Sequence, residues 1–219
     1  MEKKFKIILK NIWDVENTFY LESNLSRLIK TISHYEIFKK SIDVKGSIIE
    51  CGVFKGISLV RFLTFREFLE KKSKKAFGFD VFGKFPKQTN KKDNSFAKRH
   101  DRKAGFGYTP SKLNKIFKNK KIKNYKLIKG EINKTIPIFL KKNKKLKISF
   151  LHVDLDVYEP TFFTLNAFYK YISPKGIILL DDYSSIDGAT NAINDFIKKN
   201  KLKLRSLKSN KKLKYIVKN

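Results

Sequence analysis

The amino-acid sequence predicts an α/β protein built on a doubly wound, mostly parallel β-sheet. Short apolar runs alternate with helix-like segments over residues 46–200, which is the pattern of consecutive βαβ units. Two of these runs, residues 148–153 and 176–180, are apolar enough to be strands that are buried on both faces. Two more short runs, residues 203–207 and 213–217, are joined by a polar turn and predict a closing hairpin. We therefore expect seven strands, one of them antiparallel.

The segment before the first strand is expected to be helical. Residues 15–42 carry apolar side chains at helical spacing without Pro or Gly, so they predict one or two leading helices. We assign residues 1–45 to an N-terminal helical segment and residues 46–219 to one domain. A chain of 219 residues has the size of one such domain and can bury a sizeable core.

The first half of the predicted domain ends in a long polar stretch. It begins with a strand over 47–51, a glycine-bearing turn, a helix over 57–71 and a strand over 76–80. Residues 83–109 are polar and show no clear hydrophobic period. Long loops in compact domains are usually functional lids or disordered. We therefore expect a long lid loop over residues 83–109.

The second half continues the alternation of strands and helices. Pro110 stands near the start of a helix over 110–120, a position that proline tolerates well. The later elements are a strand over 125–129, a helix over 133–142, a strand over 148–153, a helix over 161–171, a strand over 176–180 and a helix over 189–200. In such open sheets, ligands bind outside the carboxyl ends of the strands.

The chain has a net charge of +30, and a charge of this sign and size is typical of proteins that bind nucleic acid or anionic membranes. However, only six of the fifty basic residues are arginine, the side chain best suited to bidentate contacts with phosphates and bases. The lysines are spread over the whole chain, and Asn and Ile are also abundant, as an A+T-rich genome would encode. We attribute the charge first to genome composition, and we keep nucleic acid and an acidic surface or lipid-linked glycan as alternatives.

Cysteine usage and hydropathy indicate a soluble protein of a reducing compartment. Cys51 is the single cysteine, which excludes an intramolecular disulfide and a cysteine zinc site. The first seventeen residues contain charges every few positions and no small-residue cleavage site, so they do not predict a signal peptide. No stretch approaches the roughly twenty apolar residues of a spanning helix. We expect a cytoplasmic location and leave a homo-oligomer open.

Four carboxylates follow the two most apolar strands. Asp154 and Asp156 come after the strand over 148–153, and Asp181 and Asp182 come after the strand over 176–180. Carboxylates crowded into one crevice repel one another and are costly to desolvate. An oxygen-seeking divalent cation would neutralise them. The pattern therefore predicts a site for Mg²⁺ or a similar metal, and a nearby carboxylate such as Asp156 could serve as a general base.

The first strand leads into a glycine-bearing turn, ECGVFKGIS over residues 50–58. Glycines at a strand-to-helix turn allow a ligand to approach the backbone closely. The spacing is neither the GxGxxG dinucleotide motif nor a phosphate-binding GKS/T loop. Asp80 ends the second strand, where it could accept both hydroxyl donors of a ribose. A nucleoside without a phosphate requirement fits this combination, and S-adenosylmethionine is such a ligand.

In these motifs and in their order along the chain, the sequence resembles the macrocin and deoxysugar O-methyltransferases of the TylF/MycF type. The matching segments, in the order of that family, are IIECGVFKGIS (48–58), GFDVFGKFP (78–86), LIKGEINKTIP (127–137), VDLDVYEPT (153–161), SPKGIILLDDY (173–183) and GATNAINDF (188–196). The resemblance implies a Rossmann-like class I methyltransferase fold that depends on S-adenosylmethionine and on Mg²⁺ or Mn²⁺. After Asp80, Val81 and the pair Gly83 and Lys84 depart from the family pattern, so the lid and the acceptor sugar are expected to differ.

The resemblance also implies roles for individual residues. The contacts to the methionine and ribose parts of the cofactor would be Glu50, Gly52, Val53, Gly56 and Ser58, with Asp80 on the ribose and Gly130 and Glu131 beside the adenine. The metal ligands would be Asp154, Asp181 and Asp182, and Asp156 would be the general base.

Several alternatives remain open from the sequence. The leading hypothesis is methylation of a sugar hydroxyl in a deoxysugar, nucleotide sugar or glycan. The others are an RNA methyltransferase, a methyltransferase of small catechol-type phenols, and a catalytically silent module that keeps the fold. His152 is expected to be a packed core residue, and His100 either a solvated loop residue or a second proton acceptor.

Overall fold

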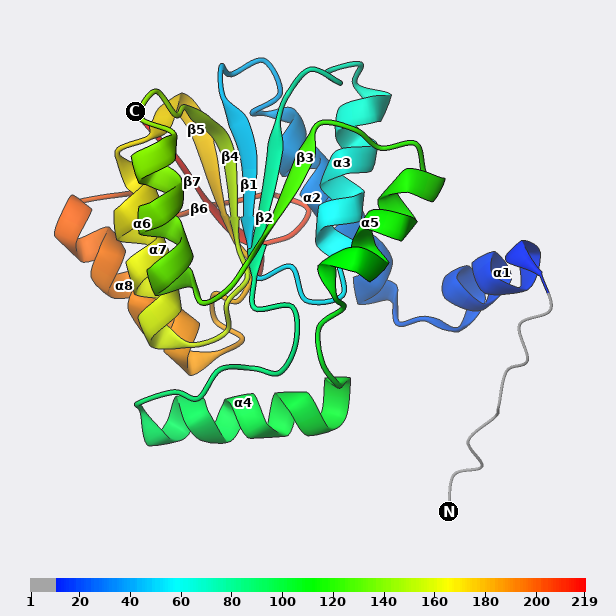
Figure 1. Ribbon diagram of the computed structural model, residues 1–219, viewed down its shortest axis with the longest axis horizontal. Coiled ribbons are helices and arrows are strands. Elements are labelled where there is room, and N and C mark those ends of the chain that lie inside the picture. Colours follow the sequence, from blue (N-terminus) through cyan, green and yellow to red (C-terminus); the bar gives the residue numbers. More distant parts are fainter. Residues whose placement is uncertain (1–10) are drawn as a thin grey trace.

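The computed structural model describes residues 11–219, so the part of the sequence before Asn11, including most of the segment tested for a signal peptide, lies outside the described residues. One seven-stranded sheet runs through the molecule in the order β3-β2-β1-β4-β5-β7-β6 (Figure 1). Its strands are β1 (Ser47–Cys51), β2 (Ala76–Asp80), β3 (Tyr125–Lys129), β4 (Ile148–Val153), β5 (Ile172–Leu180), β6 (Arg205–Ser206) and β7 (Lys214–Val217). Strands β1 to β5 are parallel, and β7 is antiparallel to both of its neighbours. The predicted fold class is confirmed.

The described helices cover both faces of the sheet. They are α1 (Ile12–Glu22), α2 (Leu25–Lys39), α3 (Ile57–Phe68), α4 (Lys91–Ala104), α5 (Pro110–Asn119), α6 (Ile132–Lys142), α7 (Tyr158–Tyr169) and α8 (Asp187–Asn200). Helices α2, α3 and α5 pack on one face, and α6, α7 and α8 pack on the other (Figure 1). None of the helices from residue 11 onward is long and apolar enough to cross a membrane.

The central strands divide their side chains between two cores because successive residues of a strand point to opposite faces. In β4, Phe150 joins the core under α2, α3 and α5, whereas Leu151 joins the core under α6, α7 and α8. The same alternation holds in β5 for Ile177 and Ile178. Both faces are buried, which explains why these strands are continuous apolar runs in the sequence.

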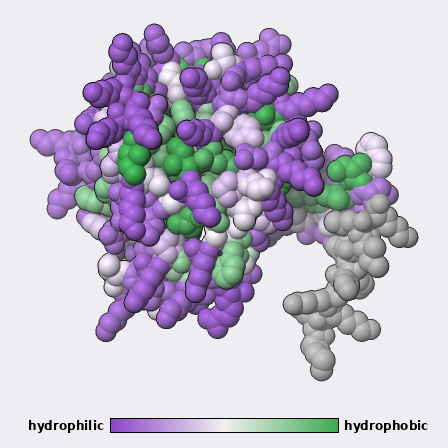
Figure 2. Space-filling model, viewed as in Figure 1, coloured by the Kyte–Doolittle hydropathy of each residue, from purple (hydrophilic) through white to green (hydrophobic). Residues whose placement is uncertain are grey.

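The N-terminal segment contains two helices of different character. The side chain of Asn24 caps α2 by accepting a hydrogen bond from the backbone N–H of Ser26. Helix α2 contributes Ile37 and Phe38 to the core, both fully buried. Helix α1, by contrast, has no buried residue and projects from the body of the molecule (Figure 1). Its apolar side chains, such as Ile12 and Leu21, are exposed, and apolar atoms are visible over this helix in Figure 2.

The prediction of an unbroken loop over residues 83–109 is wrong, because α4 occupies most of it. The side chain of Asn90 caps its first turn, and Gly105, at φ 72°, ends it. Phe96 is the one large apolar side chain of this helix, so its sequence shows no apolar stripe. Helix α4 lies across the edge of the sheet at which the parallel strands end (Figure 1).

Buried Arg66 ties the beginnings of two strands to α3. Its guanidinium donates hydrogen bonds to the carbonyls of Lys74, Lys123 and Asn124, directly before β2 and β3, and it pairs with Glu67. The Arg66 side chain is fully buried, and its guanidinium is the hydrogen-bond donor to the carbonyls of Lys74 and Lys123 in the described structure, whereas the carbonyl of Asn124 also accepts a hydrogen bond from the N–H of Ala76.

Replacing Arg66 should therefore destabilise the fold. We expect Arg66→Met to lower the free energy of unfolding by about 3 kcal/mol, because three carbonyls and Glu67 lose the guanidinium that joins them to α3. Urea unfolding measures this change. The matched control is Arg99→Met on exposed α4 surface, which should change stability by less than about 0.5 kcal/mol. Equal stabilities of the two variants would contradict the role given to Arg66.

Candidate functional site

A cavity of about 570 Å³ opens at the carboxyl ends of the parallel strands. The chain turns outward in opposite directions after β1 and β4, which makes this edge the expected ligand crevice of a doubly wound sheet. Near the strand ends it is lined by Gly52 and by six carboxylate residues, Asp80, Glu131, Asp154, Asp156, Asp181 and Asp182. Lys30 of α2 and His100 of α4 close two of its sides.

Three of the four predicted carboxylates that line this cavity lie close together. Asp154, Asp156 and Asp182 each place a carboxylate oxygen within 4.8 Å of the others. Burial, together with the charges of Asp181 and Asp182, raises the pKa of Asp154 well above its usual range. Burial and the charge of Asp156 raise the pKa of Asp182 to about 8. Protonation or a bound cation would therefore stabilise these three carboxylates.

Asp156 occupies the least relaxed backbone position of this group. Its φ is 63°, in the left-handed region, between β4 and α7. Its N–H donates a 3.1 Å hydrogen bond to the carboxylate of Asp182, and its carbonyl accepts one from Ala189. Burial raises the pKa of Asp156 to about 6, although a positive charge on His100 would oppose that rise. Such strain is typical of functional sites, where the surrounding structure enforces the conformation.

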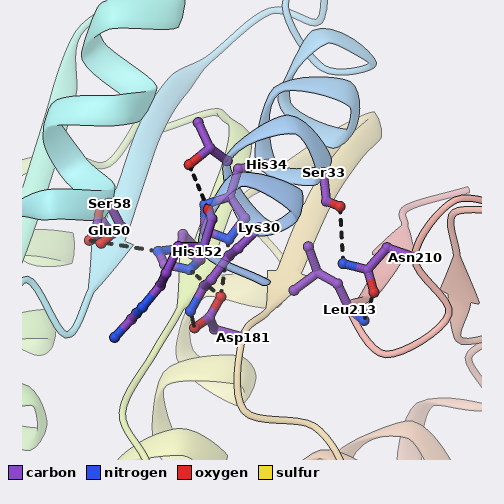
Figure 3. Close-up of polar contacts among 11 residues, drawn as sticks. Lys30, Ser33, His34, Glu50, Ser58, His152, Asp181, Asn210 and Leu213 are labelled. Carbon is purple, nitrogen blue, oxygen red and sulfur yellow. Dashed lines mark hydrogen bonds and ion pairs between the residues drawn. The ribbon is translucent and has the colours of Figure 1, made fainter. Parts of the chain in front are cut away.

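Asp181, the fourth predicted carboxylate that lines the cavity, contacts side chains of α2. One of its oxygens lies 3.1 Å from Nε2 of His34, and the other contacts Nζ of Lys30, both from α2 (Figure 3). Burial alone would raise the pKa of Asp181, but its contacts with His152 and His34 hold it well below the usual range. Asp181 is therefore an ionised partner of α2.

His152 is buried in β4, as predicted, and it also lies close to two buried carboxylates. It lies between Asp181 and Glu50, with nitrogen–oxygen distances of 3.6 and 3.7 Å. Burial alone would lower the pKa of His152, whereas the two flanking carboxylates raise it to about 10. Its imidazolium form balances the charges of Glu50 and Asp181, between which the ring lies (Figure 3). His34, in contrast, has its pKa lowered to about 4 by burial and is neutral.

The glycine-bearing turn brings two strand ends together. Gly52 has φ 93°, and a Cβ added there would lie 1.6 Å from the carbonyl oxygen of Asp154. Only glycine therefore allows this approach. The carboxylate of Asp80 accepts hydrogen bonds from the backbone N–H groups of Phe54 at 2.8 Å and Phe82 at 2.6 Å. These bonds fix Asp80 at the cavity wall.

Three of the predicted cofactor contacts line the cavity, namely Gly52, Asp80 and Glu131. The other five, Glu50, Val53, Gly56, Ser58 and Gly130, are not among its described lining residues. Glu50 is fully buried behind the cavity and accepts a 2.5 Å hydrogen bond from the hydroxyl of Ser58. Gly56, at φ 81°, starts α3. Their contacts with a cofactor stay a prediction.

Lys30 and His34 were not among the predicted site residues, and His100 was predicted to lie in a loop. Lys30 and His34 come from α2, whose apolar spacing indicates a helix but not which polar side chains face the sheet edge. His100 belongs to α4 rather than to a loop, and its ring lies 5.0 Å from that of Phe54 in the cavity wall. No motif in the sequence links these residues to the four carboxylates.

Comparisons with known proteins bear on this site. The model of the Macrocin-O-methyltransferase (TylF) family matches residues 24–209. A crystal structure of CalS11, a calicheamicin methyltransferase, is 22% identical with a TM-score of 0.77 and covers 95% of this chain and 86% of that one. The O-methyltransferase NovP is 18% identical with a TM-score of 0.75, covering 88% of this chain and 80% of that one. No sequence among the curated proteins matches significantly.

The structural likenesses, at 22% and 18% identity, establish the class I methyltransferase fold. The family match goes further, because it spans most of the chain and includes the glycine-bearing turn, Asp80 and all four cavity carboxylates. This chain therefore belongs to the TylF macrocin O-methyltransferase family and is an S-adenosylmethionine-dependent O-methyltransferase.

Proposed function

We propose that the enzyme methylates a hydroxyl of a sugar and that the reaction requires Mg²⁺ or a similar divalent cation. The main support for this proposal is the group of three carboxylates in the wall of the cavity, of which Asp182 is buried and Asp154 and Asp156 are half-buried. A nucleotide-linked deoxysugar is the substrate class we favour, because a structure similar to this one, with a TM-score of 0.68, is described as a TDP-rhamnose 3'-O-methyltransferase.

The carboxylate group fits a hard divalent cation. Carboxylate oxygens are the ligands that Mg²⁺ prefers, and Mg²⁺ is usually held by one or two carboxylates, with water and substrate completing its coordination. Asp154 and Asp182 would hold the cation, since both pKa values are raised and both side chains face Asp156. Asp181, the third ligand implied by the family resemblance, is engaged by Lys30 and His34.

We assign the role of general base to Asp156. Its carboxylate lines the cavity, and a pKa of about 6 leaves it mostly ionised yet basic enough to accept a proton near neutral pH. A bound divalent cation would lower the pKa of a sugar hydroxyl beside it. Asp156 would then take the hydroxyl proton as the oxygen attacks the methyl group.

The remaining residues would orient the reactants and limit access of water. Each oxygen of Asp80 keeps a lone pair beyond its backbone hydrogen bond, which is what the two hydroxyls of a ribose need. Phe85 and His100 bring an aromatic wall to the cavity from the segment around α4. We propose that this wall is the lid over the acceptor.

Methylation of RNA is the alternative that the charge of +30 favours. The carboxylates that line the cavity argue against it, since they would repel a phosphate backbone unless a cation fills the site. Transfer of labelled methyl groups separates the two proposals. We expect incorporation into TDP-linked deoxysugars and none into ribosomal RNA. Incorporation into RNA alone would overturn the sugar proposal.

Asp80 provides a test of the cofactor site. We expect Asp80→Asn to weaken binding of S-adenosylmethionine by about 1 to 3 kcal/mol, because a charged acceptor is lost from the ribose site. Calorimetric titration measures the affinity. Asp43→Asn is the matched control, because its side chain is 82% exposed and pairs with Lys71 away from the cavity. Unchanged affinity in Asp80→Asn would remove Asp80 from the site.

The two roles given to Asp154 and Asp156 predict different losses. Asp154→Asn should weaken Mn²⁺ binding by about tenfold or more, because a coordinating charge is removed. Asp156→Asn should leave Mn²⁺ affinity within about twofold and lower kcat by about 10²- to 10⁴-fold, the usual contribution of a general base. Electron paramagnetic resonance of free Mn²⁺ gives the affinities. Loss of Mn²⁺ binding in Asp156→Asn would make Asp156 a ligand instead.

A further inference from the structure

A lysine of helix α2 lies at the carboxylate site. Lys30 lies in the middle of α2 and is 151 residues before Asp181, yet its ammonium contacts a carboxylate oxygen of Asp181 (Figure 3). The Lys30 side chain is 37% exposed, lines the cavity and is therefore accessible from it. Asp181 itself is nearly buried, with its side chain 4% exposed.

Lys30 is an ammonium group beside an almost fully buried carboxylate: its Nζ contacts Asp181, whose side chain is 4% exposed. The ammonium also attracts the carboxylates of Asp154 and Asp182, which line the same cavity. The same three carboxylates are those that the family resemblance assigns to a metal. A divalent cation bound by these carboxylates and the ammonium of Lys30 would repel one another strongly, because the site is partly buried.

We propose that Lys30 is a built-in counter-ion that competes with the divalent cation for Asp181. This inference rests on the cation dependence proposed above. While Lys30 holds Asp181, the cation has two carboxylate ligands, Asp154 and Asp182, and a positive neighbour that weakens its binding. Displacement of Lys30 releases Asp181 as a third ligand. None of the metal ligands implied by the family resemblance lies on α2. Through Lys30, this helix would nevertheless tune the affinity of the site for the cation.

The chain offers matched variants for the test. Lys30→Met removes the charge and keeps a long, unbranched side chain that favours helix. Lys30→Arg keeps the charge on the same helix. Lys39→Met removes one positive charge from the last turn of α2 at an exposed position, which controls for net charge and helix composition.

Mn²⁺ binding to the full-length protein without substrate, followed by electron paramagnetic resonance, tests the proposal without using activity. We expect Lys30→Met to bind Mn²⁺ about tenfold more tightly than the unmodified chain, because a repelling charge leaves and a ligand is released. Lys30→Arg and Lys39→Met should bind like the unmodified chain. In Lys30→Met combined with Asp181→Asn, the gain should disappear.

Three outcomes would count against the proposal. If Lys30→Met binds Mn²⁺ equally or more weakly while the unmodified chain binds it, Lys30 does not compete, although the cation dependence stands. If the gain persists in the variant that also carries Asp181→Asn, Asp181 is not the contested ligand. If no variant binds Mn²⁺, the proposed cation dependence fails and this inference fails with it.

Discussion

Negative charge that is buried at the ends of β4 and β5 is the constraint on which the site depends. Four carboxylates follow two strands whose residues are almost all buried, and each pays a desolvation cost there. The protein meets this constraint in two ways. It surrounds Asp181 with Lys30, His34 and His152, and it leaves Asp154, Asp156 and Asp182 close together with raised pKa values. The first group is balanced within the protein, and the second is suited to a cation from outside.

The parallel sheet makes this division possible. Strands β4 and β5 are neighbours in register, so the residues that follow them meet at one edge. Gly52 lets the turn after β1 approach the backbone of Asp154 directly, which brings the predicted cofactor turn next to the carboxylates. Cofactor, acceptor and cation would therefore share one cavity without long loops to position them.

Much of this could be predicted from the sequence because strong local signals mark it. The central strands are continuous apolar runs, and the four carboxylates follow them directly, so both the sheet and the position of the acids were evident. The partners of Asp181 were not, because Lys30 and His34 come from a helix more than a hundred residues away whose only pattern is its core spacing. Helix α4 was missed because it is charged on nearly all sides, and its packing against the site depends on Asp93, His100 and other polar residues.

The most direct test of this account is to locate the cation itself. Crystals grown with Mn²⁺ and S-adenosylhomocysteine would give an anomalous difference map at the manganese absorption edge. The account predicts one strong peak between Asp154 and Asp182, beside Asp156, with Asp181 still in contact with Lys30. Crystals that contain the cofactor product but no peak in this cavity, or a peak only at a distant surface site, would contradict it.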